Sequence, residues 1–142
     1  MGTRSTMAVV HASGKVSQIY CHYDGYVEHN GKILVEHYYN LEAVEALIAL
    51  GDLSVLGKYL LPNSNEVHTF EDPVKDVCIA YGRDRGETST APAIFDDTGW
   101  LGYEGRSEEY DYIFKNGEWF LHGEEKPLST LVNGAKASNI FW

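Results

Sequence analysis

Short apolar runs joined by glycine turns constrain the fold of this chain most. Residues 109–114 and 118–122 flank Asn116-Gly117, the dipeptide that best fits the left-handed backbone of a two-residue hairpin turn. Residues 7–12 and 15–21 flank a second glycine turn in the same way. A turn this short leaves no room for a crossover, so each hairpin predicts two neighbouring antiparallel strands.

Helical spacing dominates the segment after the first hairpin. Asn40 is a favourable N-cap, and Gly51 suits the left-handed position that ends a helix. The apolar stripe between them is expected to be buried and contains Leu41, Val44, Leu47 and Ile48. Asn30-Gly31 fits either another hairpin turn or a helix start; the apolar spacing that follows favours a helix from about Asn30 to Tyr39.

The middle of the chain predicts one more strand between loops. Asp52 is expected to cap a short turn that reaches Leu56. Residues 61–73 contain two prolines and predict a polar loop, whereas residues 74–81 become apolar and predict a third strand. Residues 83–105 are rich in Gly, Asp and Thr and predict a long irregular loop.

Together these elements predict an α+β fold with an antiparallel sheet of about five strands and two helices on one face. The 142 residues suffice for one core, so residues 1–123 are assigned to a single α+β domain. Residues 124–142 form a C-terminal tail that ends in Ile140-Phe141-Trp142. These apolar side chains are expected to dock on the body or on a second subunit, and we therefore expect a homo-oligomer.

Charge and composition exclude several classes of protein. The net charge is −10, from 21 acidic and 11 basic residues, which argues against direct nucleic-acid binding. Such charge suits a basic partner, or only keeps a protein in solution. Cys21 and Cys78 lie in apolar runs and predict buried free thiols. The chain has no apolar run near 18 residues and no charged leader, so we expect no membrane contact and a cytosolic location.

Polar chemistry is densest in residues 21–39, which hold three His, three acidic groups and four Tyr. Directly after the second predicted strand come four candidate ligand contacts: His22, Tyr23, Asp24 and Tyr26. Imidazole and carboxylate also bind metals, but the spacing of His22, Asp24, His29 and His37 matches no zinc motif. We expect neither a metal nor a cofactor.

Residues 81–87 carry a second dense motif, Tyr81-Gly82-Arg83-Asp84-Arg85-Gly86-Glu87. In an extended backbone, residues i and i+2 point the same way, so Arg83 and Arg85 are expected to form a fork for a phosphate or carboxylate, with Tyr81 beside them. The alternative is internal salt bridges to Glu87, Asp96 or Asp97. The predicted site lies where residues 22–26 meet residues 82–87.

Residues 2–6 add a guanidinium, Arg4, and three hydroxyls before the first strand. Such groups are common phosphate contacts and equally common at a solvated terminus. Nucleophilic catalysis has no sequence support, because the chain lacks a Gly-x-Ser-x-Gly elbow and an activated cysteine. We therefore expect no enzyme.

The residues in segments 2–6, 21–26, 29–31 and 81–87, together with the closing hairpin, resemble those of an uncharacterised family of small bacteriophage and prophage accessory proteins. The resemblance covers roughly residues 2–122. It implies a viral origin, a location in the host bacterial cytoplasm and an accessory role in infection. Small phage accessory proteins of this kind often neutralise host defences, and this analogy sets the functional class.

Three hypotheses follow. The first is a non-enzymatic counter-defence protein that sequesters a small anionic nucleotide-type immune signal through tyrosine stacking and arginine contacts. The second is an acidic protein inhibitor that blocks a basic surface of a host defence complex, in the manner of an anti-CRISPR protein. The third is a small hydrolase that uses His22, Asp24 and His29. The motifs are neutral, aromatic and basic instead of acidic, which favours the first hypothesis over the second.

Overall fold

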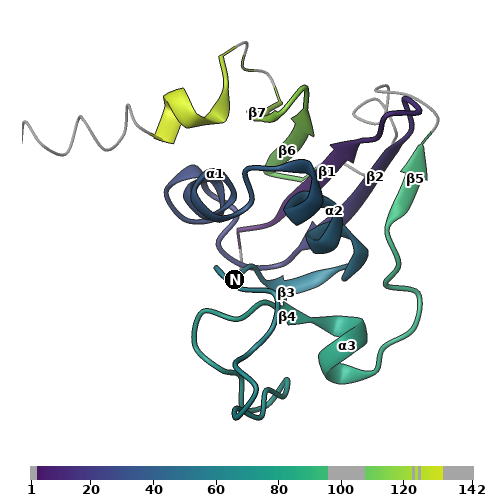
Figure 1. Cartoon of the computed structure of the whole chain (residues 1–142), viewed down its shortest axis with the longest axis vertical. Coiled ribbons are helices and arrows are strands. Elements are labelled where there is room, and N and C mark those ends of the chain that lie inside the picture. Colours follow the sequence, from purple (N-terminus) through teal and green to yellow (C-terminus); the bar gives the residue numbers. More distant parts are fainter. Residues whose placement is uncertain (1–2, 96–107, 123, 125, 133–142) are drawn as a thin grey trace, which may run out of the picture.

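The computed structural model describes residues 3–95, 108–122, 124 and 126–132, and it shows an α+β fold built on one mixed sheet (Figure 1). The strands are β1 Ser5–Val10, β2 Val16–Cys21, β3 Leu53–Val55, β4 Ile79–Ala80, β5 Ala93–Phe95, β6 Tyr110–Lys115 and β7 Glu118–Leu121. The helical elements are a π-helical turn η1 Val27–Gly31 and the helices α1 Lys32–His37, α2 Leu41–Ala49 and α3 Tyr81–Arg85. Residues 128–132 form a further helical turn.

The predicted α+β class is confirmed, but the predicted five-stranded antiparallel sheet is wrong. The sheet has seven strands in the order β4-β3-β2-β1-β6-β7, with β5 paired to β2 beside this path. β1 pairs with β6 in parallel, and β2 pairs with β3 in parallel. Hairpin turns specify only strands that are neighbours in sequence, so the turns could not reveal these two distant pairings.

Both predicted hairpins are confirmed. β1 and β2 pair from Ser5↔Cys21 to Val10↔Val16, and β6 and β7 pair from Tyr112↔Leu121 to Lys115↔Glu118. Asn116 and Gly117 have φ values of 52° and 80°. Both are left-handed, as a type I′ turn requires, which explains why this dipeptide predicted the turn correctly.

The two predicted helices are confirmed and pack on one face of the sheet (Figure 1). Asn40 Oδ1 accepts a hydrogen bond from the Ala43 amide at 2.8 Å, and Gly51 follows the helix with φ 81°. Val44, Leu47 and Ile48 are buried, but Leu41 is 43% exposed and does not belong to the core. Leu41 is the first residue of α2, where the helix has not yet reached the sheet.

Three local predictions in the middle of the chain are wrong. The expected turn after Asp52 is β3, whose Leu53 is fully buried and pairs with Cys21 and Ala80. The expected third strand shrinks to β4, because the backbone turns into α3 at Tyr81. The expected irregular loop contains β5, which pairs with the first half of β2. Residues 96–107 lie outside the described residues.

The core lies between the sheet and the helices. Its fully buried side chains include Met7, Ile19, Leu34, Leu47, Leu53 and Tyr112. Leu128 and Val132 belong to the same cluster, so the described part of the predicted tail packs on the body. Cys21 and Cys78 are buried and unbridged, as predicted. None of the described helices is long and apolar enough to cross a membrane.

Candidate functional site

Part of the first motif is buried inside the protein, including Cys21, Gly25 and Asn30. Segments 3–5, 21–25 and 29–31 meet at Asn30, which has no exposed surface. Its Nδ2 atom lies 3.3 Å from Ser5 Oγ, 3.5 Å from Cys21 Sγ and 3.3 Å from the Tyr23 carbonyl oxygen. Because a buried amide needs such partners, these residues hold one another in place. We call Ser5, Cys21, Gly25, Asn30 and Tyr112 the interlock.

Gly25 allows the interlock to close. Its amide donates to the Thr3 carbonyl at 2.8 Å, and its carbonyl accepts from the Tyr112 hydroxyl at 2.6 Å. A Cβ atom at this position would lie 2.7 Å from Ser5 Cβ. Burial raises the pKa of the Cys21 thiol to about 12, so this sulfur is a neutral packing group and not a nucleophile.

The remaining residues of this motif lie on the surface. His22 Nδ1 is 2.7 Å from the Tyr20 hydroxyl, and the His22 and Tyr23 rings meet edge to face at 4.5 Å. Asp24 has a φ of 58°, which makes it a turn residue. The Tyr26 ring lies 6.0 Å from that of His29.

Arg4 is a basic group close enough to Tyr20 to act on the pKa of its hydroxyl. Desolvation by burial raises the pKa of Tyr20, the Arg4 guanidinium counteracts this shift, and the Glu108 carboxylate reinforces it. Asp52 is also close, since its Oδ1 accepts from the Tyr20 amide at 3.0 Å. With two carboxylates beside one guanidinium, the surroundings of Tyr20 do not favour an anion.

The second motif forms a structural clamp instead of an anion fork. Residues 81–85 are helical, so Arg83 and Arg85 do not share the extended geometry that the fork required, and that prediction is wrong. Arg83 donates to both oxygens of Asp84, to the Leu60 carbonyl and to the Cys78 carbonyl. We call Leu60, His68, Cys78, Arg83 and Asp84 the clamp.

Asp84 is the centre of the clamp, and its side chain is only 4% exposed. Oδ2 accepts from the Ala80 amide at 2.8 Å and lies 3.2 Å from His68 Nε2. Burial acts to raise the pKa of Asp84, but the Arg83 hydrogen bonds, the Ala80 amide and the nearby charges together lower it below its ordinary value.

Arg85 and Tyr81 also have partners within the protein. Arg85 Nε lies 3.4 Å from Glu87 Oε2, and its guanidinium carbon lies 5.0 Å from the centre of the Phe70 ring. The Phe70 and Tyr81 rings are 5.8 Å apart. The internal pairing with Glu87, weighed as the alternative to a ligand contact, is present.

The two motif segments leave β3 at opposite ends. The amides of His22 and Tyr23 donate to Leu53 O and Ser54 O, so this chain runs on toward the end of β3. The Tyr81 amide donates to Asp52 O, before β3 begins. No contact of Arg83 or Arg85 with Tyr23 or Tyr26 is found among the described residues. The two motifs approach each other at Tyr81, which is close enough to Tyr20 to help raise the pKa of its hydroxyl.

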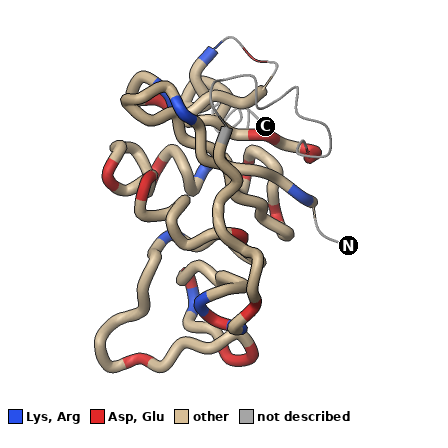
Figure 2. The backbone as a smooth tube through the Cα atoms, turned by 90° about the vertical axis from the view of Figure 1, so that its right-hand side faces the viewer, with Lys and Arg blue, Asp and Glu red and all other residues tan. Residues whose placement is uncertain are grey.

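A surface that the sequence did not single out lies on α1 and α2. Two apolar side chains are exposed there, Tyr39 at 66% and Leu41 at 43%. The same helices carry three exposed carboxylates, one of which, Glu45, lies 3.3 Å from His11 Nδ1. Figure 2 shows the acidic positions on the helices. We call the exposed residues Glu36, Tyr39, Leu41, Glu42 and Glu45 the acidic face. No signal for it was present in the sequence, since the helical spacing predicted that Leu41 is buried.

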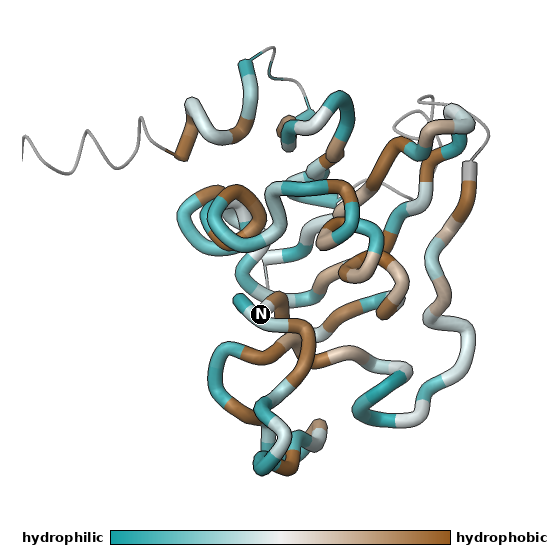
Figure 3. The backbone as a smooth tube through the Cα atoms, viewed as in Figure 1, coloured by the Kyte–Doolittle hydropathy of each residue, from teal (hydrophilic) through white to brown (hydrophobic). Residues whose placement is uncertain are grey.

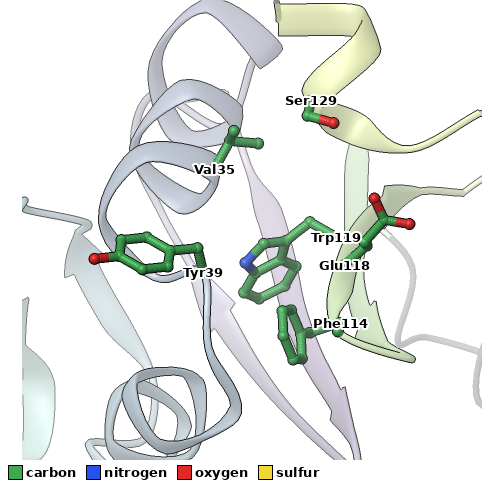
Figure 4. Close-up of a pocket in the computed structure, with 7 residues that line it drawn as sticks. Val35, Tyr39, Phe114, Glu118, Trp119 and Ser129 are labelled. Carbon is green, nitrogen blue, oxygen red and sulfur yellow. The ribbon is translucent and has the colours of Figure 1, made fainter.

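A cavity of about 170 Å³ adjoins the acidic face and shares Tyr39 with it (Figure 4). Val35, Phe114 and Trp119 line it, and the last two rings meet edge to face at 5.4 Å. Trp119 Nε1 donates to the Tyr38 carbonyl at 2.7 Å. This bond holds the indole still, so the cavity has a preformed aromatic wall.

Comparison with protein-family models, curated proteins and solved structures gave no match. Within the described residues, no three His, Cys, Asp or Glu side chains are grouped so that they could hold a metal ion. We therefore infer the function from the arrangement of the described residues.

Proposed function

We propose that this protein is a phage-encoded counter-defence protein that binds, without catalysis, a basic surface of a host defence protein. The acidic face carries this proposal: Tyr39 and Leu41 are exposed, α1 and α2 carry three exposed carboxylates, and Tyr39 borders a cavity with a rigid aromatic wall. Exposed apolar groups provide the binding energy at protein interfaces, and the surrounding charges select the partner. The phage origin and the defence role rest on the family resemblance.

Sequestration of a small anionic nucleotide-type signal is the second candidate. The sequence favours this candidate because polar and aromatic residues are concentrated in two motifs. Both arginines of the second motif have partners within the protein: Arg83 donates to Asp84, Leu60 and Cys78, and Arg85 pairs with Glu87. The candidate residues of the first motif remain at the surface. What still favours this candidate is Arg4, for which no ion pair within the described residues is found.

A hydrolase is the least supported candidate. His22 Nδ1 contacts Tyr20, and His29 Nδ1 contacts the Asn30 side chain at 2.9 Å. Within the described residues, no side-chain hydrogen bond links His22, Asp24 and His29. An acid–base pair needs such contact or a shared reacting atom.

A role in the host bacterial cytoplasm follows from the same proposal. The homo-oligomer is a separate prediction. Residues 140–142, on which the oligomer prediction depends, lie outside the described residues. Light scattering at micromolar concentration tests it: the mass should be at least that of a dimer and should fall to that of a monomer when residues 140–142 are removed.

The proposed function is tested by charge reversal. Bacteria with defined defence systems are challenged with phage while they express the wild type or Glu36→Lys/Glu42→Lys. The matched control is Glu109→Lys/Glu124→Lys, which makes the same change in net charge outside the acidic face. We expect the wild type and the control to restore plaques, and the acidic-face variant to lose at least tenfold in plating efficiency.

Two outcomes would overturn this assignment. Equal protection by all three proteins would remove the acidic face from the mechanism. A nucleotide released by heat from the purified wild type, and identified by mass spectrometry, would instead establish the small-ligand candidate, above all if Arg4→Ala abolished its retention.

A further inference from the structure

A groove of about 410 Å³ opens in the loop between β3 and β4. One lining ring, that of Tyr59, lies 6.2 Å from the ring of His37 at the end of α1. Its apolar lining comes from both arms of this loop: Tyr59, Leu61 and Pro62 from the outgoing arm, and Val74 and Val77 from the returning arm. We call residues 56–78 the excursion. Figure 1 shows it as the long loop that leaves the sheet below β3 and β4.

The apolar groups of the excursion are unusually exposed. Tyr59 is 56% exposed, Leu61 69% and Val67 81%, so three of the seven exposed large hydrophobic residues in the described chain lie here. Figure 3 shows hydrophobic positions in this loop, far from the core. Clusters of this kind on a protein surface commonly mark a binding site.

The groove is held by hydrogen bonds and does not need to form on binding. The Tyr59 amide donates to Asp76 O at 3.0 Å, and the Cys78 amide donates to Tyr59 O at 2.9 Å. These two hydrogen bonds join the outgoing and the returning arm of the loop. The Val74 amide donates to His68 Nδ1 at 2.9 Å, and Arg83 donates to Leu60 O. Two clamp residues, His68 and Arg83, thus hold the Val74 and Leu60 segments of the loop in place. A preformed groove binds more tightly because less conformational entropy is lost.

The charges around the groove select its occupant. Residues 58–76 carry four carboxylates, Glu66, Glu71, Asp72 and Asp76, against two ammonium groups, Lys58 and Lys75. All four carboxylates belong to exposed residues. Glu66 and Lys75 both line the groove itself, so the acidic excess comes from Glu71, Asp72 and Asp76 in the rest of the loop. A partner with Lys or Arg beside its apolar group gains attraction here, whereas an acidic partner is repelled.

We propose that this groove docks a protein segment in which an aromatic or aliphatic side chain is flanked by Lys or Arg. The apolar side chain enters between Tyr59, Leu61 and Val74, and the basic groups face the carboxylates of the excursion. This inference rests on the proposed function in one respect: it assigns a second contact surface to the same basic host protein.

A random-peptide display library selected on the immobilised wild-type protein tests the chemistry. Selected peptides are synthesised, and their affinities are measured by fluorescence anisotropy for the wild type, for Leu61→Ser and for Val67→Ser. Val67 is the matched control, because it is more exposed than Leu61 but does not line the groove. We expect peptides rich in Lys or Arg around one apolar residue, an affinity loss of at least tenfold for Leu61→Ser and less than twofold for Val67→Ser.

Several results would overturn the inference. Selected peptides without basic residues, or peptides that bind Leu61→Ser as tightly as the wild type, would exclude the proposed occupant. Sedimentation that shows a wild-type dimer dissociated by Leu61→Ser would assign the groove to a second copy of this chain. A Tyr59→Ser variant repeats the test, and an unchanged melting temperature shows that each variant is folded.

The plaque assay separates this inference from the proposed function. If the wild type gives no protection against any defence system, the proposed function fails while the peptide result stands on its own. If the wild type protects and Leu61→Ser protects equally, the groove has no part in defence binding, and only the inference fails.

Discussion

The interlock has a distinctive sequence but a structural role, whereas the excursion has an ordinary loop sequence and forms a candidate binding surface. The interlock contains the most distinctive residues of the chain, yet Ser5, Cys21 and Asn30 have no exposed surface. Residues 61–73 of the excursion were predicted only as a polar loop, yet the excursion exposes Tyr59, Leu61 and Val67 to solvent beside a groove. A dense polar motif can thus have a structural cause. A buried polar group costs free energy unless it has a hydrogen-bond partner, so burial requires particular residues around it. A binding surface needs only exposure, shape and charge.

The largest expected effect is in the interlock. Tyr112 is fully buried and its hydroxyl donates to Gly25 O, so Tyr112→Ala should lower the free energy of unfolding by about 3–5 kcal/mol. Tyr112→Phe keeps the ring and should cost only about 1–2 kcal/mol, since it leaves one buried carbonyl without its partner. Urea denaturation of the three proteins measures both differences. If Tyr112→Ala cost under 1 kcal/mol, the interlock would not stabilise the fold.

The next largest effect is in the clamp. Arg83→Ala removes the hydrogen bonds to Asp84, Leu60 and Cys78 and should lower the free energy of unfolding by about 2 kcal/mol. Arg85→Ala is the matched control, because the Arg85 side chain is 54% exposed and contacts only exposed Glu87 and the Phe70 ring within the described residues. It should cost less than about 0.5 kcal/mol. Equal losses for both variants in thermal denaturation would contradict the structural role of Arg83.

The sequence predicted what depends on neighbouring residues. Asn116-Gly117 and Asn40 encode a turn and a helix cap locally, and both features are present. The parallel pairing of β1 with β6 joins segments more than 100 residues apart, such as Ser5 and Tyr110, and no local pattern encodes it. For α3 the sequence did contain a helix-ending glycine, Gly86, but the apolar run before Tyr81 favoured a strand instead. Gly86, with φ 75°, ends this helix in the left-handed conformation typical of a C-terminal glycine.

The candidate site was harder to predict for the same reason. That Arg83 points inward depends on Leu60 and Cys78, which approach it only when the excursion folds back. Exposure of Tyr39 and Leu41 likewise depends on the way α1 and α2 meet the sheet. Residue type indicated which groups were able to bind a ligand, but the tertiary fold decided which of them remained accessible.

A smaller, pH-dependent effect should come from Asp84. Its folded-state pKa is lowered below the ordinary value, so its stabilising contribution is complete at neutral pH and is lost as the pH falls through the folded-state pKa. Asp84→Asn has no such titration. The difference in unfolding free energy between wild type and Asp84→Asn should therefore be constant near pH 7 and shrink below about pH 4. Urea denaturation from pH 7 to pH 3 measures it, and a difference that grew on acidification would refute the lowered pKa.

The smallest effect on stability is expected in the excursion, where the comparison with the interlock is sharpest. Leu61 and Val67 are mostly exposed, so Leu61→Ser and Val67→Ser should each change the free energy of unfolding by less than about 0.5 kcal/mol. Differential scanning calorimetry should then give three nearly identical melting curves. If Leu61→Ser instead cost 2 kcal/mol or more, Leu61 would be a packing residue like those of the interlock. A Leu61→Ser variant that keeps its stability but loses peptide binding would identify Leu61 as part of a binding surface. Exposed residues such as Leu61 contribute to affinity, whereas buried residues such as those of the interlock contribute to stability.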